Sequence, residues 1–300
     1  MTNSTQTRAK PARISFLDKY IPLWIILAMA FGLFLGRSVS GLSGFLGAME
    51  VGGISLPIAL GLLVMMYPPL AKVRYDKTKQ IATDKHLMGV SLILNWVVGP
   101  ALMFALAWLF LPDQPELRTG LIIVGLARCI AMVLVWSDLS CGDREATAVL
   151  VAINSVFQVT MFGALGWFYL QVLPSWLGLP TTTAQFSFWS IVTSVLVFLG
   201  IPLLAGVFSR IIGEKIKGRE WYEQKFLPAI SPFALIGLLY TIVLLFSLQG
   251  DQIVSQPWAV VRLAIPLVIY FVGMFFISLI ASKLSGMNYA KSASVSFTAA

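Results

Sequence analysis

The stretch Gly120-Leu-Ile-Ile-Val-Gly-Leu-Ala-Arg-Cys-Ile-Ala-Met-Val-Leu-Val-Trp-Ser137 is apolar except near its centre, where Arg128 and Cys129 stand side by side. Its length is close to the about 20 residues that an α-helix needs to cross the hydrocarbon layer of a membrane. Backbone polar groups cannot face lipid without partners, so a bilayer segment of this kind must be helical. The stretch therefore predicts a membrane-spanning helix with a charge near mid-membrane.

The rest of the chain has the same character. Of its 300 residues, 58% are hydrophobic and only 11% are charged, whereas soluble domains carry about 25% charged residues. We therefore predict an all-α, polytopic transmembrane helical bundle. Apolar segments are expected at residues 20–36, 51–71, 88–111, 119–137, 146–173, 186–212, 228–248 and 258–282, with a ninth beginning near residue 289.

Basic residues are distributed unevenly over the loops between these segments. Of the 21 Lys and Arg, 17 lie in the N-terminal tail and in alternate loops, whereas the other loops hold only Arg37, Arg118 and Arg262. Loops rich in Lys and Arg stay on the cytoplasmic side of a membrane. We expect a multi-pass protein of the cell membrane with a cytoplasmic tail at residues 1–19. This asymmetry accounts for the net charge of +8, so no nucleic-acid partner is expected.

A faint internal repeat adds to this picture. Ser55-Leu-Pro-Ile-Ala-Leu-Gly-Leu-Leu63 is similar to Ser231-Pro-Phe-Ala-Leu-Ile-Gly-Leu-Leu239, 176 residues later. The copies fall in the second and seventh segments, an odd number of spans apart, so the two halves would have opposite orientations, as in transporters with inverted repeats. We expect a first repeat over 20–173 and a second over 186–300. The second is one span short, so a truncated form of a ten-span protein is expected.

Arg128 and Cys129 are the main departures from the apolar pattern. An arginine at the centre of a spanning helix costs about 2.5–3.5 kcal/mol, so Arg128 is expected to face a polar cavity, a partner or a broken helix end. Alternatively, the segment is shifted and the side chain reaches the interface. Cys129 is predicted to be buried at mid-depth and far from Cys141, leaving two free thiols. The neighbouring cation favours the Cys129 thiolate, whereas burial opposes it.

Other polar residues in the apolar segments give weaker signals. Asn95 and Asn154 lie in the segments before and after that of Arg128, so both are placed to meet it in a cavity. Alternatively, each bonds a neighbouring helix. Features of enzymes are missing from the sequence, which has one histidine, no Cys/His cluster at metal-ligand spacing, no phosphate-binding loop and no paired carboxylates in apolar segments. We expect no enzyme activity and no cofactor.

Five short motifs stand out: Gly125-Leu-Ala-Arg-Cys-Ile-Ala-Met-Val133, Trp136-Ser-Asp-Leu139, Gly142-Asp143, Met65-Met-Tyr-Pro-Pro-Leu-Ala-Lys-Val73 and Asn95-Trp-Val-Val-Gly-Pro100. Together they resemble one known family, the arsenical-resistance arsenite efflux permeases. The resemblance runs from about Phe16 to the end of the chain. It implies two inverted five-helix repeats with broken helices that cross in mid-membrane, in a superfamily shared with bile acid symporters. It also implies export of arsenite, As(III), and often antimonite by proton antiport, with Cys129 at the functional cysteine position.

The candidate substrate-binding residues are therefore Cys129, Arg128, Asn95 and Asn154. As(III) prefers soft sulfur ligands, and a single thiol at Cys129 suits a site that must release its cargo. Arg128 is expected to lower the thiol pKa or to pair with a carboxylate beyond the sequence. Arsenite or antimonite, protons and the lipid bilayer are the expected partners, and the oligomeric state stays open. The alternatives are a sodium-coupled organic anion symporter of the same superfamily and a membrane-embedded receptor or enzyme.

Overall fold

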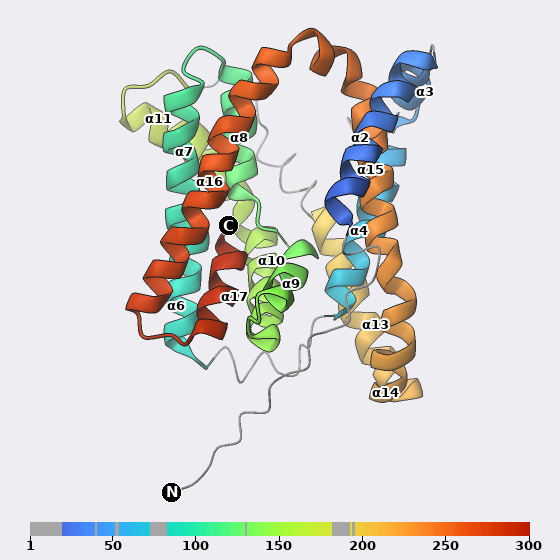
Figure 1. Cartoon of the computed structure of the whole chain (residues 1–300), viewed down its shortest axis with the longest axis vertical. Coiled ribbons are helices and arrows are strands. Elements are labelled where there is room, and N and C mark those ends of the chain that lie inside the picture. Colours follow the sequence, from blue (N-terminus) through green and yellow to red (C-terminus); the bar gives the residue numbers. More distant parts are fainter. Residues whose placement is uncertain are drawn as a thin grey trace, which may run out of the picture.

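The computed structural model describes residues 20–39, 41–51, 54–72, 83–129, 131–181, 193 and 196–300. Within these ranges the chain is almost entirely helical (Figure 1). The helices, with η for π-helical turns, are α2 (Ile21–Ser38), α3 (Leu42–Ala48), α4 (Leu56–Lys72), α6 (Lys85–Ile93), η1 (Leu94–Val98), α7 (Gly99–Phe110), α8 (Pro115–Leu126), α9 (Ala131–Leu139), α10 (Arg144–Trp167), η2 (Phe168–Val172), α11 (Leu173–Trp176), η3 (Leu196–Gly200), α13 (Ile201–Lys217), α14 (Arg219–Trp221), η4 (Tyr222–Phe226), α15 (Leu227–Ser255), α16 (Pro257–Leu284) and α17 (Tyr289–Ala299). The two-residue strands β1 (Glu50–Val51) and β2 (Ile54–Ser55) pair antiparallel.

The prediction of an all-α polytopic membrane bundle is confirmed. Six helices in the described part of the chain are long and apolar enough to cross a membrane. Large apolar side chains on them point outward, among them Phe34, Leu109 and Ile216, which are 63%, 71% and 73% exposed. Contact of such apolar side chains with lipid is favourable, whereas their contact with water is not. The tail at 1–19 and part of the segment at 186–212 lie outside the described residues.

The helices form two bundles that stand side by side (Figure 1). The small bundle contains α2, α4, α13 and α15, and the large bundle contains α6, α7, α8, α9, α10, α16 and α17. The most extensive helix contacts among described residues run within a bundle, such as those of α15 with α2 and α4. Each bundle therefore takes helices from both halves of the chain.

Glycines set the close packing of the small bundle. A Cβ on Gly237 of α15 would lie 2.8 Å from the backbone nitrogen of Met65 and 3.0 Å from the carbonyl oxygen of Gly61, both in α4. Gly61 and Gly237 hold the same position in the repeated motif, 176 residues apart. The two copies of the motif therefore pack against one another.

Two further close contacts are related to one another by nearly the same separation in sequence. A Cβ on Gly32 of α2 would lie 2.9 Å from the Cβ of Phe246 in α15, and one on Gly206 of α13 would lie 2.9 Å from the carbonyl carbon of Leu70 in α4. Phe246 and Leu70 are 176 residues apart, and Gly206 and Gly32 are 174 apart. This packing is what inverted repeats would produce, and we keep the repeats at 20–173 and 186–300 as a proposal.

The large bundle is tied at the end where α6 begins. There α17 packs inside the bundle, and Ser294 and Ser296 are fully buried. Lys291 Nζ donates to Asp84 Oδ2 at 2.7 Å, and Asp84 also accepts from the backbone N–H of Leu87 as the N-cap of α6. These bonds hold the pKa of the Asp84 carboxyl below its ordinary value.

A second ion pair ties the opposite end of the large bundle. Arg262 in the first turns of α16 makes two bonds to Asp113, from Nη1 to Oδ2 at 2.8 Å and from Nη2 to Oδ1 at 2.5 Å. Arg262 Nη2 also donates to the carbonyl oxygen of Phe110 at 3.0 Å. The hydrogen bonds from Arg262 lower the pKa of Asp113 from 3.8 to about 2. The pair fastens α16 to the turn between α7 and α8.

Replacing Gly237 by valine is expected to destabilise the protein by about 1–3 kcal/mol, because the new side chain meets backbone atoms of α4 that cannot move aside. Thermal unfolding in detergent measures the effect as a lower Tm. Gly120→Ala is the matched control, because a Cβ there meets nothing within 4 Å. Equal Tm values for the two variants would contradict the close contact.

Replacing Asp113 by asparagine is expected to lower the Tm near neutral pH. The Asp113 pKa is depressed in the folded state, so its contribution is present above the ordinary value of 3.8 and is lost as the pH falls through about 2. The Tm difference between wild type and variant should thus be constant from neutral pH down to about 5 and shrink below 4. A difference independent of pH would show that the carboxylate charge is not involved.

Candidate substrate site

The segment predicted as one helix over 119–137 is two half-helices. Helix α8 ends at Leu126, residues 127–129 are not helical, and α9 begins at Ala131. Ala127 is extended, with ψ of 135°. A break frees carbonyl groups at the end of α8, and within a membrane these need partners from the protein. The continuous span is therefore a wrong prediction, and the expectation that Arg128 meets a broken helix end is confirmed.

Arg128 supplies these partners. Its side chain is buried, and its Nη2 donates to the carbonyl oxygen of Gly125 at the end of α8. Nη1 donates to the carbonyl oxygen of Ala299 in α17 at 3.1 Å, and the backbone N–H donates to Gln158 Oε1 in α10 at 3.0 Å. The carboxyl end of a helix carries a partial negative charge, which stabilises the guanidinium. Arg128 thus joins α8, α10 and α17 at the break.

Gly99 leaves the space that the guanidinium occupies. A Cβ on Gly99 would lie 3.0 Å from Arg128 Nη1 and 3.0 Å from the hydroxyl oxygen of Tyr270. Gly99 follows the π-helical turn η1, a type of irregularity that often marks functional sites. The α7 backbone therefore approaches Arg128 more closely than any side chain would allow.

Asn95 and Asn154 meet one another. Asn154 Nδ2 donates to Asn95 Oδ1 at 3.3 Å, and both residues are buried. Trp96 Nε1 donates to Asn154 Oδ1 at 3.1 Å, and Asn95 Nδ2 donates to the carbonyl oxygen of Ser91 at 2.8 Å. Bonds between neighbouring helices, the alternative raised for these residues, are thus present. A role for either asparagine in binding substrate stays a prediction.

Cys129 is exposed, so the prediction that it is buried is wrong. At the break the side chains of neighbouring residues differ in exposure, because Arg128 is buried in the large bundle whereas Cys129 is exposed. Cys141 is also exposed and is a free thiol, as predicted for both cysteines. Helix α9, which follows the break, lies on the side of the large bundle that faces the small bundle (Figure 1).

Three residues of this region were missed by sequence reasoning: Gln158, Gly99 and Tyr270. Gln158 follows Asn154 by four residues and so shares its face of α10, a signal that was available. Gly99 of α7 lies against Arg128, and the hydroxyl oxygen of Tyr270 in α16 lies close to the same Gly99 position. Nothing in the local sequence of either residue indicates these contacts. The site therefore extends across α7, α8, α10, α16 and α17.

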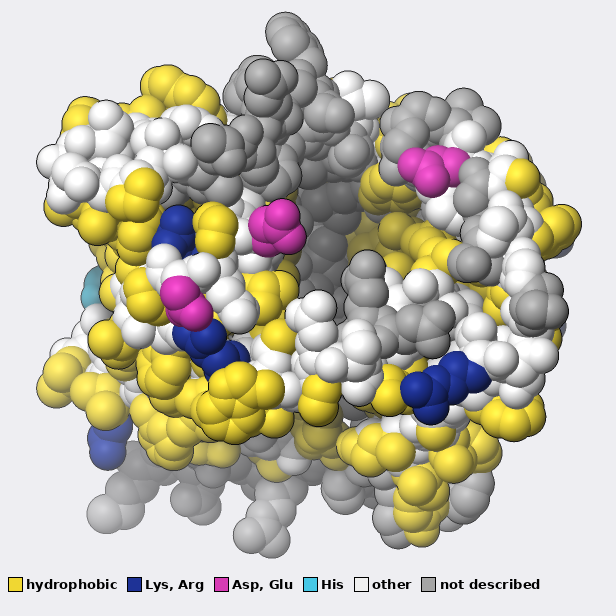
Figure 2. Space-filling model, turned by 90° about the horizontal axis from the view of Figure 1, so that it is seen from above, with side chains coloured by type: hydrophobic (Ala, Val, Ile, Leu, Met, Phe, Trp, Pro, Cys, Tyr) yellow, Lys and Arg dark blue, Asp and Glu magenta, His cyan; other side chains and the backbone are white. Residues whose placement is uncertain are grey.

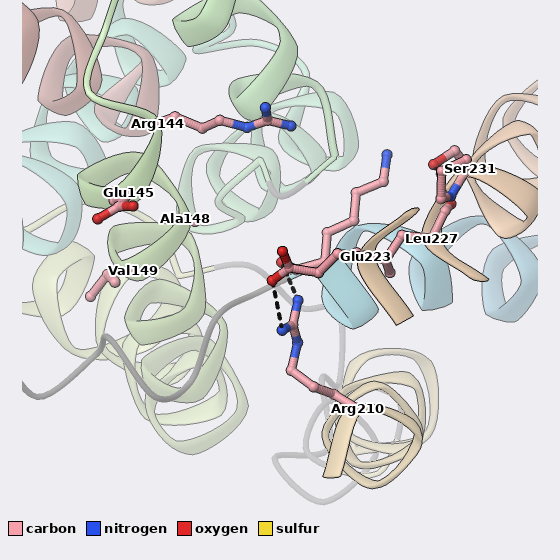
Figure 3. A pocket seen from close by; sticks show the side chains of 10 residues that line it. Arg144, Glu145, Ala148, Val149, Arg210, Glu223, Leu227 and Ser231 are labelled. Carbon is pink, nitrogen blue, oxygen red and sulfur yellow. Dashed lines mark hydrogen bonds and ion pairs between the residues drawn. The ribbon is translucent and has the colours of Figure 1, made fainter. Parts of the chain in front are cut away.

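A pocket of about 600 Å³ opens between the bundles at the end where α4 finishes and α10 begins (Figure 3). We call this end the basic end, because most of the Lys and Arg among the described residues lie there, including Lys72, Arg144 and Arg210. The pocket is lined by Lys72, Arg144, Glu145, Ala148, Val149, Arg210, Glu223, Leu227, Pro228 and Ser231. Figure 2 shows the opposite end, where hydrophobic side chains predominate among the described residues.

Comparison with known proteins identifies the family of the chain. The model of the Sodium Bile acid symporter family matches residues 59–256. The chain belongs to this family. A curated relative, Arsenical-resistance protein Acr3 of Corynebacterium glutamicum, is 99% identical over 300 residues, which are 100% of this chain and 81% of that protein. The symporter-family membership and this identity confirm the resemblance to the arsenical-resistance permeases.

Two more distant relatives are also named as a transporter or as an arsenical-resistance protein. Arsenical-resistance protein Acr3 of Alkaliphilus metalliredigens is 28% identical over 275 residues, covering 88% of this chain and 74% of that protein. An uncharacterized transporter of Synechocystis is 32% identical over 295 residues, covering 92% of this chain and 75% of that protein. As a member of a transporter family with many apolar helices, the chain is a multi-pass membrane transporter and not an enzyme.

Replacing Arg128 by methionine is expected to destabilise the protein, because the carbonyl groups of Gly125 and Ala299 lose their donor. Each buried carbonyl left without a partner costs about 1–3 kcal/mol. Thermal unfolding in detergent measures the loss as a reduced Tm. Arg37→Met, which removes an exposed arginine from the last turn of α2, is the control and should change the Tm little. Equal, small changes in both variants would indicate that Arg128 does not anchor the break.

Proposed function

We propose that this protein is a secondary active transporter that exports arsenite, As(III), from the cytoplasm, with antimonite as a second substrate and protons as the coupling ion. The observation that carries the proposal is the exposed thiol of Cys129 at a helix break, beside an arginine whose charge is held by the protein itself. A soft thiol at an otherwise apolar break suits a soft metalloid better than it suits a carboxylate or a sugar.

The chemistry of release favours a single thiol. As(III) in neutral water is largely uncharged As(OH)3, and a cysteine thiol condenses with it to form one S–As bond and one water molecule. Water reverses the reaction and returns the thiol with its proton, with no change of oxidation state. Two or three thiols would hold As(III) more tightly than a transporter can use. Cys141, the other cysteine, lies in the turn before α10 and not at the break.

We propose that Arg128 holds Cys129 in position and does not itself contact the substrate. The guanidinium lies against carbonyl groups of α8 and α17, so it fixes the extended residues that carry Cys129. Because the substrate As(OH)3 is uncharged, its binding does not require the positive charge of Arg128, which faces into the large bundle. Asn95 and Asn154, the other predicted contacts, would then support the break through Gln158, which lies one turn after Asn154 on α10.

The proposed orientation of the protein in the membrane follows from the distribution of Lys and Arg. In the described part of the chain, the basic end of the bundles carries most Lys and Arg, and such loops remain in the cytoplasm. We place the N-terminal tail and the pocket at the basic end in the cytoplasm. As(III) would then enter from the pocket side, bind Cys129, and leave on the opposite face after the two bundles rock against one another.

The relatives support arsenic as the substrate, since two of them are named arsenical-resistance proteins. A second candidate is a sodium-coupled organic anion symporter, which the family description favours. Such a transporter would recognise its ligand with polar groups such as Asn95 and Asn154. In this structure those groups are buried and bonded to one another, whereas the thiol is exposed.

Replacing Cys129 by serine is expected to reduce arsenite uptake into everted membrane vesicles at least tenfold, because a hydroxyl is a far weaker ligand for As(III) than a thiol. The initial rate with full-length protein is the measurement. Cys141→Ser is the matched control and should keep the wild-type rate. Wild-type transport by the Cys129→Ser variant would show that the thiol has no role.

The same vesicles decide the coupling ion. If protons are exchanged for arsenite, dissipating the pH gradient stops uptake, and replacing sodium by potassium has no effect. Uptake that needs sodium and survives loss of the pH gradient would replace antiport with sodium coupling. Competition by a bile acid, together with a lack of arsenite transport, would favour the organic anion alternative.

A further inference from the structure

The pocket at the basic end is lined by charges of both signs from both bundles. The small bundle contributes Lys72 at the end of α4, Arg210 of α13 and Glu223 of η4. The large bundle contributes Arg144 and Glu145 from the first turn of α10. In Figure 3 the Arg144 guanidinium extends from α10 into the pocket, and the Glu223 carboxylate enters it from the other bundle. Opposite charges therefore face one another across an open space.

The charges of the small bundle are fixed to that bundle. Arg210 Nη2 donates to the carbonyl oxygen of Lys72 at 3.2 Å, and its Nη1 donates to Glu214 at 2.6 Å. Arg210 Nη1 also lies 3.8 Å from Glu223 Oε1, and Arg219 Nε donates to the same oxygen at 3.2 Å. Arg210 thus joins α4, α13 and η4, and Glu223 keeps its place when this bundle moves.

The charges of α10 are fixed to the large bundle in the same way. Asp143 caps α10 by accepting from the backbone N–H groups of Glu145 and Ala146 at 3.1 and 3.0 Å. Its own N–H donates to the carbonyl oxygen of Ala290, and Ser294 Oγ donates to its carbonyl oxygen at 3.0 Å. The start of α10 is therefore attached to α17, and Arg144 moves with it.

We propose that this pocket is the cytoplasmic mouth of the transport pathway and that an ion pair between Arg144 and Glu223 closes it in the outward-facing state. Closure removes water from the pocket, and a charge taken out of water is costly unless an opposite charge meets it. Arg144 and Glu223 carry opposite charges on opposite walls of the pocket, so the two walls are complementary at this point. The structure then represents the state that is open to the cytoplasm. The proposal rests on the proposed function, because only a transporter needs to close this mouth.

Charge exchange tests the pair. Arg144→Glu and Glu223→Arg are each expected to lower the initial rate of arsenite uptake into everted vesicles at least fivefold, because like charges then meet on closure. The double variant should return to within about twofold of wild type, as the pair is restored in reverse. Single variants with the wild-type rate would overturn the proposal, as would a double variant no better than the poorer single variant.

Glu223→Arg also disturbs the contacts with Arg210 and Arg219, so a second measurement avoids charge reversal. With Cys141→Ser as background, Arg144→Cys and Glu223→Cys are combined in the full-length protein and oxidised. Mass spectrometry is expected to find a disulfide between positions 144 and 223, which needs Cα atoms within about 7 Å. Uptake should be lost on oxidation and restored by a reductant.

The control pair combines Arg144→Cys with Glu220→Cys. Glu220 is exposed on α14 and does not line the pocket. A disulfide at 144–220 as abundant as that at 144–223, or no disulfide at 144–223, would overturn the proposal. Disulfide formation is read without arsenite, so its presence in a protein that transports no arsenite would refute the proposed function and not the closure.

Discussion

The bonds from Arg128 to the carbonyl oxygens of Gly125 and Ala299 support the arrangement around them. A helix that breaks within a membrane leaves backbone groups without partners, and lipid supplies none. A guanidinium has five donors in a fixed plane, so one side chain can bond carbonyl groups of two helices at once. Burial of its charge is in turn tolerated because the Gly125 carbonyl lies at the partially negative carboxyl end of α8. The break and the buried arginine therefore stabilise each other.

The position of Cys129 follows from the same bonds. Arg128 faces inward at the break, and its neighbour Cys129 is exposed. Gly99 contributes by allowing α7 to approach the guanidinium, and Gln158 contributes by fixing the Arg128 backbone. A thiol at the edge of this break is held in place and is still accessible. A cysteine packed within a continuous helix would have lacked that access.

Much of the fold could be predicted from apolar runs, because their length is set by the membrane. The segment 258–282, for example, corresponds to α16 within two residues at each end. The break in 119–137 could not be predicted from periodicity, because both half-helices remain apolar and the partner of Arg128 is 171 residues away. The exposure of Cys129 was missed for the same reason. The bonded pair of Asn95 and Asn154 was within reach, since each was recognised as a polar residue in a neighbouring segment.

The proposed rocking requires that each bundle move as a unit. Close contacts at glycines, such as that of Gly237 in α15 with α4, hold the small bundle together. The ion pairs Asp84–Lys291 and Asp113–Arg262 fasten the large bundle at both ends. Helix α15 of the small bundle continues into α16 of the large bundle through Gln256, at the end opposite the pocket (Figure 1). A rotation about that connection changes the opening at the basic end most. The charges that line the pocket therefore lie where a small rotation moves the walls furthest.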